Sequence, residues 1–135
     1  MNTPETPAPR ALTILLVDDD ELMIETLGWL LQSLGHQVET ASHGQEAIEK
    51  LKAGFSADVV LMDQQMPGLT GVETLAQLRP LWPQLPVLLA SGTHDRALEE
   101  SLAAYLPARL LKKPLQLPTL REALASLPRP LRDPA

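Results

Sequence analysis

The sequence predicts an α/β domain in which a parallel sheet is covered by helices on both faces. Five short apolar runs alternate along the chain with five stretches whose apolar residues recur at helical spacing. This alternation is typical of a doubly wound (βα)5 arrangement, because two parallel strands are joined by a helical crossover. The length of 135 residues suits one such domain with a sizeable core.

The predicted strands are apolar runs, short enough to be buried strands of a parallel sheet. The run TILLV is the clearest, and it leads directly into three aspartates. In chain order, the strands are expected at residues 13–17, 37–40, 57–62, 86–90 and 109–111.

The predicted helices follow these strands and show apolar residues three or four positions apart. Gly35 is expected to end the first helix, and Pro80 and Pro107 the third and the fourth. Pro118 is expected near the first turn of the fifth. The helices are expected within residues 23–34, 44–53, 72–78, 98–105 and 118–127.

The two ends of the chain differ from the rest in composition. Residues 1–11 and 128–135 hold six of the 13 prolines and few large apolar side chains. Such segments cannot bury enough apolar surface to order themselves. We therefore expect one domain at residues 12–127, between a flexible N-terminal tail and a flexible C-terminal tail or linker stub.

Composition argues against several classes of protein. A formal net charge of −6 disfavours loose binding to nucleic acid or to an anionic membrane. The absence of cysteine excludes disulfides and thiolate chemistry. No apolar run approaches the roughly 18 residues that a membrane span needs, and residues 1–11 lack the apolar segment of a secretory signal. A soluble, cytoplasmic protein is expected.

Polar side chains stand where the predicted strands end. Asp18 and Asp19 follow the first strand, Asp63 the third, Ser91 the fourth and Lys113 the fifth. The carboxyl ends of parallel strands share one edge of the sheet, and ligands of such sheets bind there. We therefore expect these five side chains to meet in one site.

The aspartates in this set favour a divalent cation. Clustered carboxylates repel one another unless a cation lies between them, and hard oxygen ligands suit Mg2+. The alternative is that residues 18–20 only cap the next helix, a role that we expect for Asp20. For Asp18 and Asp19, the presence of Asp63 favours a metal site.

Asp63 is a candidate nucleophile, because an aspartate can hold a phosphoryl group as an aspartyl phosphate. Its alternative is a solvated charge where a strand meets a loop. Ser91 and Lys113 could then contact the phosphoryl oxygens, although Ser91 could also be an ordinary loop serine. Neighbouring strand residues point to opposite faces, so only one of Lys112 and Lys113 can readily reach the site.

Five segments in this order resemble the receiver domain of two-component response regulators, including the chemotaxis regulators. They read LLVDDD, GHQVETASHGQEAIEKL, VVLMDQQMPGLTG, PVLLASG and LLKKPL, and the resemblance covers roughly residues 12–127. It implies a flavodoxin-like sheet with the strand order 2-1-3-4-5. Each segment is a weak signal alone, whereas five in order at suitable spacing are a strong one.

The resemblance also implies roles for the site residues. Asp18, Asp19, Asp63 and the backbone carbonyl of Gln65 would hold Mg2+ or Mn2+, and Asp63 would be the phosphoacceptor. In the same family, Ser91 corresponds to the switch hydroxyl, Lys113 contacts the phosphoryl group, and the Lys113–Pro114 bond is often cis. Relatives often carry Tyr or Phe three residues before the lysine, where this chain has Leu110, so a rotating aromatic switch is not expected.

By the same resemblance, the expected function is to receive a phosphoryl group from a phosphohistidine on a histidine kinase or a phosphotransfer domain. Such a domain catalyses only its own phosphorylation and dephosphorylation, and is not otherwise an enzyme. The output would reach an effector protein or a fused domain, and the fourth helix, fifth strand and fifth helix could form a dimer. Two alternatives are a pseudo-receiver that only docks and a Mg2+-dependent small-molecule phosphatase; no inserted cap supports the latter.

Other side chains that often carry chemistry are assigned ordinary roles. His36, His43 and His94 are expected on the surface or in turns, away from the strand-end carboxylates. Trp29 and Trp82 are expected to be packing residues.

Overall fold

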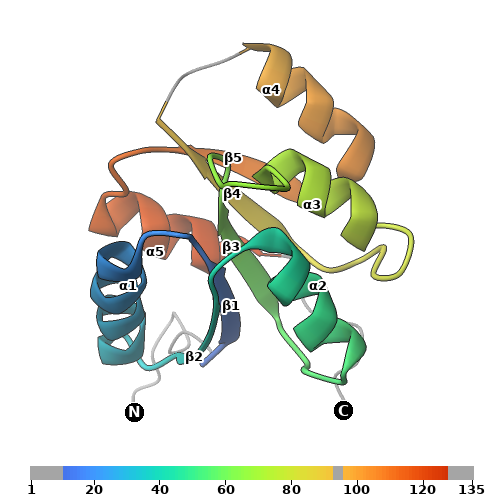
Figure 1. Ribbon diagram of the computed structural model, residues 1–135. Helices are drawn as coiled ribbons and strands as arrows, with labels where there is room; N and C mark the ends of the chain where they lie inside the picture. Colours follow the sequence, from blue (N-terminus) through green and yellow to red (C-terminus); the bar gives the residue numbers. More distant parts are fainter. Residues whose placement is uncertain (1–10, 93–95, 128–135) are drawn as a thin grey trace, which may run out of the picture.

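A computed structural model describes residues 11–92 and 96–127 of the chain. Five parallel strands form one sheet in the order β2-β1-β3-β4-β5, and helices cover both of its faces (Figure 1). Both the (βα)5 class and the expected strand order are confirmed. The strands are β1 (Thr13–Val17), β2 (Gln37–Ala41), β3 (Val59–Asp63), β4 (Val87–Ser91) and β5 (Ala108–Lys112).

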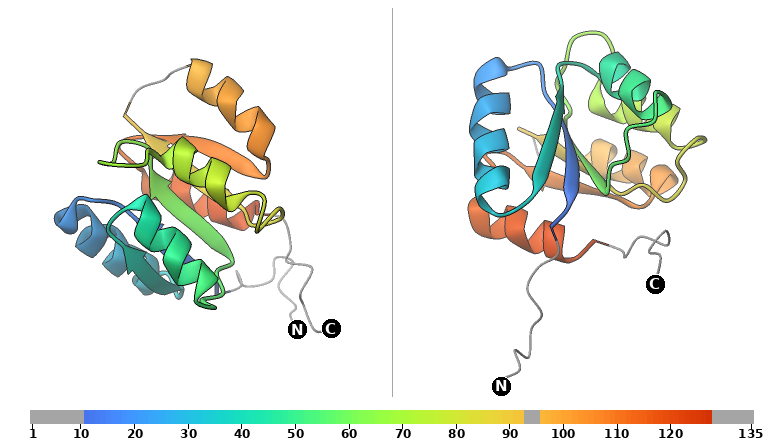
Figure 2. Two further views of the ribbon diagram at one scale, coloured as in Figure 1. Left: turned by 45° about the vertical axis from the view of Figure 1, so that its right-hand side comes forward. Right: turned by 90° about the horizontal axis from the view of Figure 1, so that it is seen from below.

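The helices lie in two layers. α1 and α5 pack on one face of the sheet, and α2, α3 and α4 pack on the other (Figures 1 and 2). The fourth helix is shorter than expected, because its last turn tightens into a separate 3₁₀ turn, η1. The bounds are α1 (Glu21–Ser33), α2 (Gly44–Lys52), α3 (Gly71–Leu78), α4 (Arg96–Leu102), η1 (Ala103–Tyr105) and α5 (Leu117–Ala125).

Every residue of β3 and β4 is buried, as expected for central strands covered on both faces. Successive side chains of these strands enter different cores. Val60 and Met62 pack with α2, α3 and α4, whereas Val59 and Leu61 pack with α1 and α5. The apolar runs of the sequence therefore form the sheet, which is the middle layer between two layers of helices.

Local signals set the ends of the helices. Asp20 caps α1, where its Oδ1 accepts hydrogen bonds from the backbone N–H groups of Leu22 at 3.0 Å and Met23 at 3.4 Å, so its expected role is confirmed. Gly35 ends the helix with a φ of 100°, a left-handed conformation that favours glycine. Pro118 lies in the first turn of α5, as expected.

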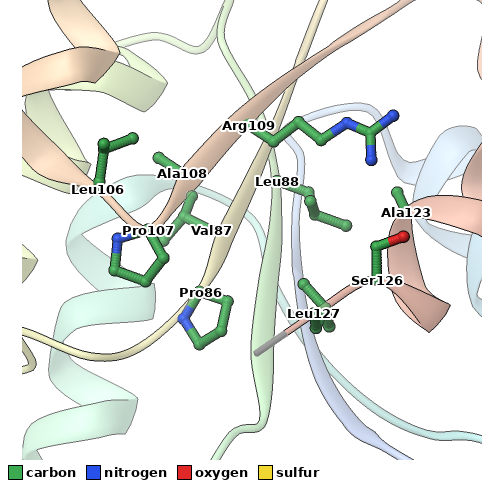
Figure 3. Close-up of a pocket in the computed structure, with 10 residues that line it drawn as sticks. All are labelled: Pro86, Val87, Leu88, Leu106, Pro107, Ala108, Arg109, Ala123, Ser126 and Leu127. Carbon is green, nitrogen blue, oxygen red and sulfur yellow. The ribbon is translucent and has the colours of Figure 1, made fainter. Parts of the chain in front are cut away.

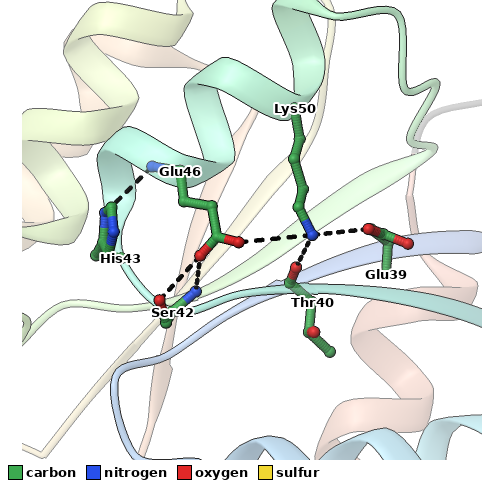
Figure 4. Close-up of polar contacts among 6 residues, drawn as sticks. All are labelled: Glu39, Thr40, Ser42, His43, Glu46 and Lys50. Atoms are coloured by element: carbon green, nitrogen blue, oxygen red, sulfur yellow. Dashed lines mark hydrogen bonds and ion pairs between the residues drawn. The ribbon is translucent and has the colours of Figure 1, made fainter.

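A polar network joins the start of α2 to β2 (Figure 4). His43 caps the helix, with its Nδ1 accepting a hydrogen bond from the Glu46 N–H at 3.2 Å. The Glu46 carboxylate accepts hydrogen bonds from the backbone N–H and the hydroxyl of Ser42 at 2.7 and 2.9 Å. Lys50 lies between this carboxylate and Glu39, at 3.7 and 2.7 Å. These contacts give His43 a structural role in a turn, in agreement with the sequence.

Trp29 does not pack as expected. Its side chain is 70% exposed, on the outward face of α1. Leu27 and Leu31 lie two positions away on either side and take the buried face. Two positions correspond to about 200° around a helix, so Trp29 lies on the opposite face and points outward. Trp82 is partly buried and packs against the core on the α2, α3 and α4 face, as expected.

Arg79, just after α3, forms an unexpected anchor between two loops. Its guanidinium donates hydrogen bonds to four backbone carbonyl oxygens, at distances of 2.7 to 3.1 Å. Burial lowers the pKa of this group. The bonds connect the α3–β4 loop to the segment between η1 and β5. The acceptors are Trp82, Leu85, Tyr105 and Pro107.

Some sequence predictions fall outside the described residues. These concern the tail segments 1–10 and 128–135 and His94. Within residues 11–92 and 96–127, no helix is long and apolar enough to cross a membrane.

Candidate functional site

Buried polar side chains gather where the strands end. In the described part of the chain, the four most buried polar or charged residues are Asp18, Asp63, Thr74 and Ser91. Asp63 is the last residue of β3 and Ser91 the last of β4, while Asp18 follows β1 directly. Three of the four residues therefore lie at the carboxyl edge of the sheet, and the fourth, Thr74, lies in α3.

Three carboxylates meet at this edge. One oxygen from each of Asp18, Asp19 and Asp63 lies within 4.8 Å of the others. Pairing of Val17 with Met62 in the sheet makes Asp18 and Asp63 neighbours one residue further along. The Asp18 N–H donates to the carbonyl oxygen of Ala41 at 3.1 Å, which extends the contact with β2 past the strand.

Lys113 completes the group from the other side. Its Nζ lies 2.8 Å from Asp63 Oδ1, and its backbone N–H donates to the Ser91 carbonyl oxygen at 2.8 Å. The Lys113–Pro114 peptide bond is cis, as the resemblance implied. Lys112 pairs with Ser91 in the sheet, and its side chain is exposed. Of the two lysines, Lys113 is therefore the one that reaches the site.

The charges of this cluster influence one another. Burial raises the pKa of Asp18, the hydrogen bond from the Asp20 N–H opposes this rise, and the charge of Asp63 adds to it. Burial lowers the pKa of Lys113, but its contact with Asp63 and the charges of Asp18 and Asp19 outweigh that effect, so the net pKa is raised. One ammonium thus stays charged beside three carboxylates, and the site retains an excess of negative charge.

These residues fit a divalent cation. Asp63 Oδ1 is buried and, although Lys113 lies close, it accepts no hydrogen bond of regular geometry from the described residues. Buried carboxylate oxygens without such bonds are strongly stabilised by a metal ion. Oxygen ligands at this spacing suit Mg2+, with water completing its shell. Gln65 lies in the exposed loop after β3, and the role of its carbonyl as a further ligand stays a prediction.

Ser91 lies beside the phosphoacceptor candidate. It follows Ala90, which pairs with Asp63 in the sheet, and only 1% of its surface is exposed. The sheet therefore places a carboxylate, a hydroxyl and an ammonium at the ends of three adjacent strands: Asp63 ends β3, Ser91 ends β4 and Lys113 directly follows β5. Leu110 is half-buried and packs against the core on the α2, α3 and α4 face.

Comparison with known proteins shows the family of this chain. The sequence model of the response regulator receiver domain matches residues 14–125. The chain belongs to this family. The gliding motility regulatory protein of Myxococcus xanthus is 34% identical over 126 residues, which make up 91% of this chain and 16% of that protein. This receiver domain spans less than half the length of the curated relatives that it matches.

Solved structures agree in fold. The chemotaxis protein CheY4 of Vibrio cholerae superposes with a TM-score of 0.81 at 27% identity, covering 88% of this chain and 100% of that one. The response regulator TrrA of Thermotoga maritima, solved in complex with Mg2+ and BeF, superposes with a TM-score of 0.77 at 28% identity. That alignment covers 86% of this chain and 98% of TrrA.

The receiver domain also has an apolar pocket of about 320 Å3 at the other end of the sheet (Figure 3). It is lined by the start of β4 and of β5 and by the end of α5, with Arg109 and Ser126 as its polar side chains. Arg109 is paired with Glu122 at 2.7 Å. The pocket holds no carboxylate cluster and lies at the amino ends of the strands, so it is separate from the acidic site.

Sequence reasoning missed two residues close to the site, Gln64 and Gly71. Gln64 directly follows Asp63 and hydrogen bonds to the start of α3, and Gly71 lies against the Asp63 backbone. Both residues lie in the segment VVLMDQQMPGLTG, but the resemblance implied roles there only for Asp63 and for the Gln65 carbonyl. Gly71 is the first residue of α3, and a glycine in such a position is consistent with close packing of the helix against other backbone. The sequence does not show which part of the backbone that is.

Proposed function

We propose that this receiver domain accepts a phosphoryl group on Asp63 from a phosphohistidine of a histidine kinase or of a phosphotransfer domain. One observation carries the proposal: Asp63 is buried at a strand end, with two further carboxylates on one side and an ammonium 2.8 Å away on the other. A carboxylate in this setting can act as a nucleophile when a cation offsets the surrounding negative charge.

The transfer has a simple bond balance. An Asp63 carboxylate oxygen forms a bond to phosphorus, the bond between phosphorus and the histidine nitrogen breaks, and the nitrogen keeps that electron pair. Asp18, Asp19, Asp63 and the Gln65 carbonyl would hold Mg2+. When bound, Mg2+ neutralises phosphoryl oxygens as the charge on them rises. Hydrolysis of the acyl phosphate by water later restores the carboxylate.

Ser91 and Lys113 act on the product. The Lys113 ammonium offers charge-assisted hydrogen bonds to a phosphoryl oxygen, and the Ser91 hydroxyl offers one donor to another. Ser91 ends β4, and Lys113 directly follows β5, which contacts α4. New contacts of these two residues would therefore favour one of two arrangements of that region. We propose that the effector, or a fused domain, reads the face formed by α4, β5 and α5, and that a dimer would use the same face.

The domain boundaries belong to this proposal as well. We propose that residues 12–127 act as one phosphorylatable module, that residues 1–11 are an N-terminal tail and that residues 128–135 are a C-terminal tail or linker stub. The chain promotes only its own modification and its reversal. A receiver structure solved with Mg2+ and BeF supports the assignment of Mg2+ by similarity.

The test is labelling with acetyl phosphate and Mg2+, followed by intact mass measurement. The wild type should gain the mass of a single phosphoryl group, in acid-labile form, and Asp63→Asn should gain none. Asp20→Asn is the matched control, because asparagine also caps a helix and Asp20 lies outside the carboxylate cluster. It should label like the wild type, and equal labelling of Asp63→Asn would contradict the proposal.

A further inference from the structure

The loop between β3 and α3 is held by the residue that follows the phosphoacceptor. The Gln64 N–H donates to the Ala90 carbonyl oxygen at 2.8 Å, which ties the residue to β4. Its own carbonyl oxygen accepts a hydrogen bond from the Gly71 N–H at 3.0 Å. Its side-chain Oε1 accepts one from the Val72 N–H at 2.9 Å. Both ends of the loop are thus connected to one residue.

These bonds complete the N-terminus of α3. The first four N–H groups of a helix have no partner within it. Gln64 provides acceptors for two of them, the N–H groups of Gly71 and Val72. Thr70 and Glu73 satisfy the other two: the Thr70 hydroxyl accepts a hydrogen bond from the Glu73 N–H at 3.2 Å, and the Glu73 carboxylate accepts one from the Thr70 N–H at 2.9 Å. The Val72–Gln64 bond is therefore a side-chain hydrogen bond that links this helix start to the residue that follows Asp63.

The loop also lies tightly against the Asp63 backbone. A Cβ added to Gly71 would come within 2.8 Å of the Asp63 carbonyl oxygen and within 3.0 Å of Gln64 Cα. Real Cβ atoms are not found this close to backbone atoms, so α3 can approach here only with glycine in this position. A shift of α3 relative to the loop would therefore move Asp63 or Gln64 directly.

We propose that Gln64 is a positioning residue for phosphorylation: by bonding to Val72 it fixes the loop and so orients the Asp63 carboxylate and the Gln65 carbonyl. This inference rests on the proposed role of Asp63. Gln64 is not among the residues proposed to hold the metal or the phosphoryl group, and it acts through its neighbours. A displacement of a reacting group by about 1 Å can lower a rate by up to about 100-fold, so loss of this bond should affect the rate.

The experiment compares Gln64→Met, which removes the acceptor at similar size, with Gln64→Glu, which retains an acceptor oxygen. Gln77→Met, on the exposed face of α3, is the matched control for the chemical change. Three readouts apply to each folded variant: the labelling rate by acetyl phosphate at saturating Mg2+, the Mg2+ dissociation constant, and hydrogen exchange of the Val72 amide.

Gln64→Met should label about tenfold more slowly and bind Mg2+ roughly tenfold more weakly, with faster exchange at Val72. Gln64→Glu should restore the labelling rate and the protection of Val72, and Gln77→Met should match the wild type. A residue that served only to cap α3 would change stability and leave the rate at saturating Mg2+ unaltered. A wild-type rate in Gln64→Met, or an equally slow Gln64→Glu, would overturn the proposal.

If Gln64→Met does not fold, Gln64→Asn replaces it with the same expectations, because its amide is one methylene too short to reach Val72. A wild-type protein that takes no phosphoryl group would contradict the function proposed for Asp63, and the Mg2+ titration would then decide the role of Gln64 by itself. Weaker binding in the variant would support the positioning role, and equal binding would overturn it.

Discussion

Lys113 Nζ lies 2.8 Å from Asp63 Oδ1, although the two residues come from strands that are separated in the sheet by β4. Lys113 therefore balances part of the negative charge of the three carboxylates, and its ammonium lies close to the oxygen atoms of the proposed phosphoacceptor.

Replacing Lys113 with Ala should separate metal binding from signalling. The ammonium is not a metal ligand, so Mg2+ affinity should be kept or increase, while the conformational response to phosphorylation should be lost. Calorimetric Mg2+ titration and a comparison of amide spectra with and without acetyl phosphate would measure the two effects. Lost Mg2+ affinity together with an intact response would show that the residue has a different role.

The same substitution should also affect stability. Removal of the ammonium leaves buried carboxylate charge uncompensated, which should cost about 1–3 kcal/mol without Mg2+, a value reduced for the partial exposure of Lys113. Because the pKa of Lys113 is raised in the folded state, its contribution is present at neutral pH and is lost only as the pH rises through that folded-state pKa. Urea unfolding at pH 7 and at high pH measures the difference in unfolding free energy between the wild type and Lys113→Ala. A difference that does not shrink at high pH would contradict this prediction.

Asp18→Asn should stabilise the metal-free protein at neutral pH and weaken Mg2+ binding. The pKa of Asp18 is raised in the folded state, chiefly by burial, so the folded state binds this proton more tightly than the unfolded state. Wild-type stability should therefore gain from protonation of Asp18 as the pH falls toward its unfolded value of about 3.8. The advantage of the variant should shrink over that range.

Urea unfolding at several pH values, with a chelator present, measures this difference between the two proteins. Asparagine can still accept the hydrogen bond from the Asp20 N–H, so the variant tests the charge and not the turn. If the greater stability of Asp18→Asn does not change with pH, the charge on Asp18 is not what destabilises the metal-free protein.

Arg79→Met should destabilise the domain by about 2–4 kcal/mol, because four backbone carbonyls would lose their donor. Arg79→Lys should recover only part of the loss, since an ammonium cannot match the planar fork of the guanidinium. Phosphorylation of the folded variants should proceed as in the wild type, because none of these carbonyls belongs to the acidic site. Urea unfolding tests this, and a loss below about 0.5 kcal/mol would remove Arg79 as an anchor.

Gly71 and Gly28 allow the same substitution, glycine to alanine, to be compared at a crowded and at an open position. Gly71→Ala would place Cβ 2.3 Å from Leu89 Cδ1 and 2.8 Å from the Asp63 carbonyl oxygen, so it should cost about 1–3 kcal/mol. Gly28 lies inside α1 with open space where a Cβ would be, so Gly28→Ala should stabilise by about 0.5–1 kcal/mol. Thermal unfolding measures both. Equal effects would mean that the close approach at Gly71 is not what matters there.

The sequence was sufficient for the fold and for the residues of the acidic cluster because both depend on short-range patterns. Apolar runs ending in Asp18 and Asp63 identify strands and strand ends, and parallel topology then brings those ends together. Trp29 was misjudged because its apolar character says nothing about which face of α1 it occupies. Leu27 and Leu31 decide that, through their spacing.

The contacts of Gln64 and Arg79 could not be predicted in the same way. The side chain of each residue hydrogen bonds to backbone N–H or carbonyl groups elsewhere in the chain. Because these backbone groups hardly differ from one residue type to another, the sequence does not indicate which of them will be the partner. Only the closed fold brings the Tyr105 carbonyl to Arg79, across 26 positions of sequence. Side chains that bond to distant backbone therefore leave no pattern in a single sequence.

The most direct test of the central claim is to locate the modified residue. Borohydride reduces an aspartyl phosphate to homoserine, so the protein labelled with acetyl phosphate and Mg2+ can be reduced, digested and sequenced by tandem mass spectrometry. The account predicts homoserine at position 63 and at no other aspartate. Homoserine at position 18 or 19 with Asp63 intact, or none anywhere in labelled protein, would contradict it.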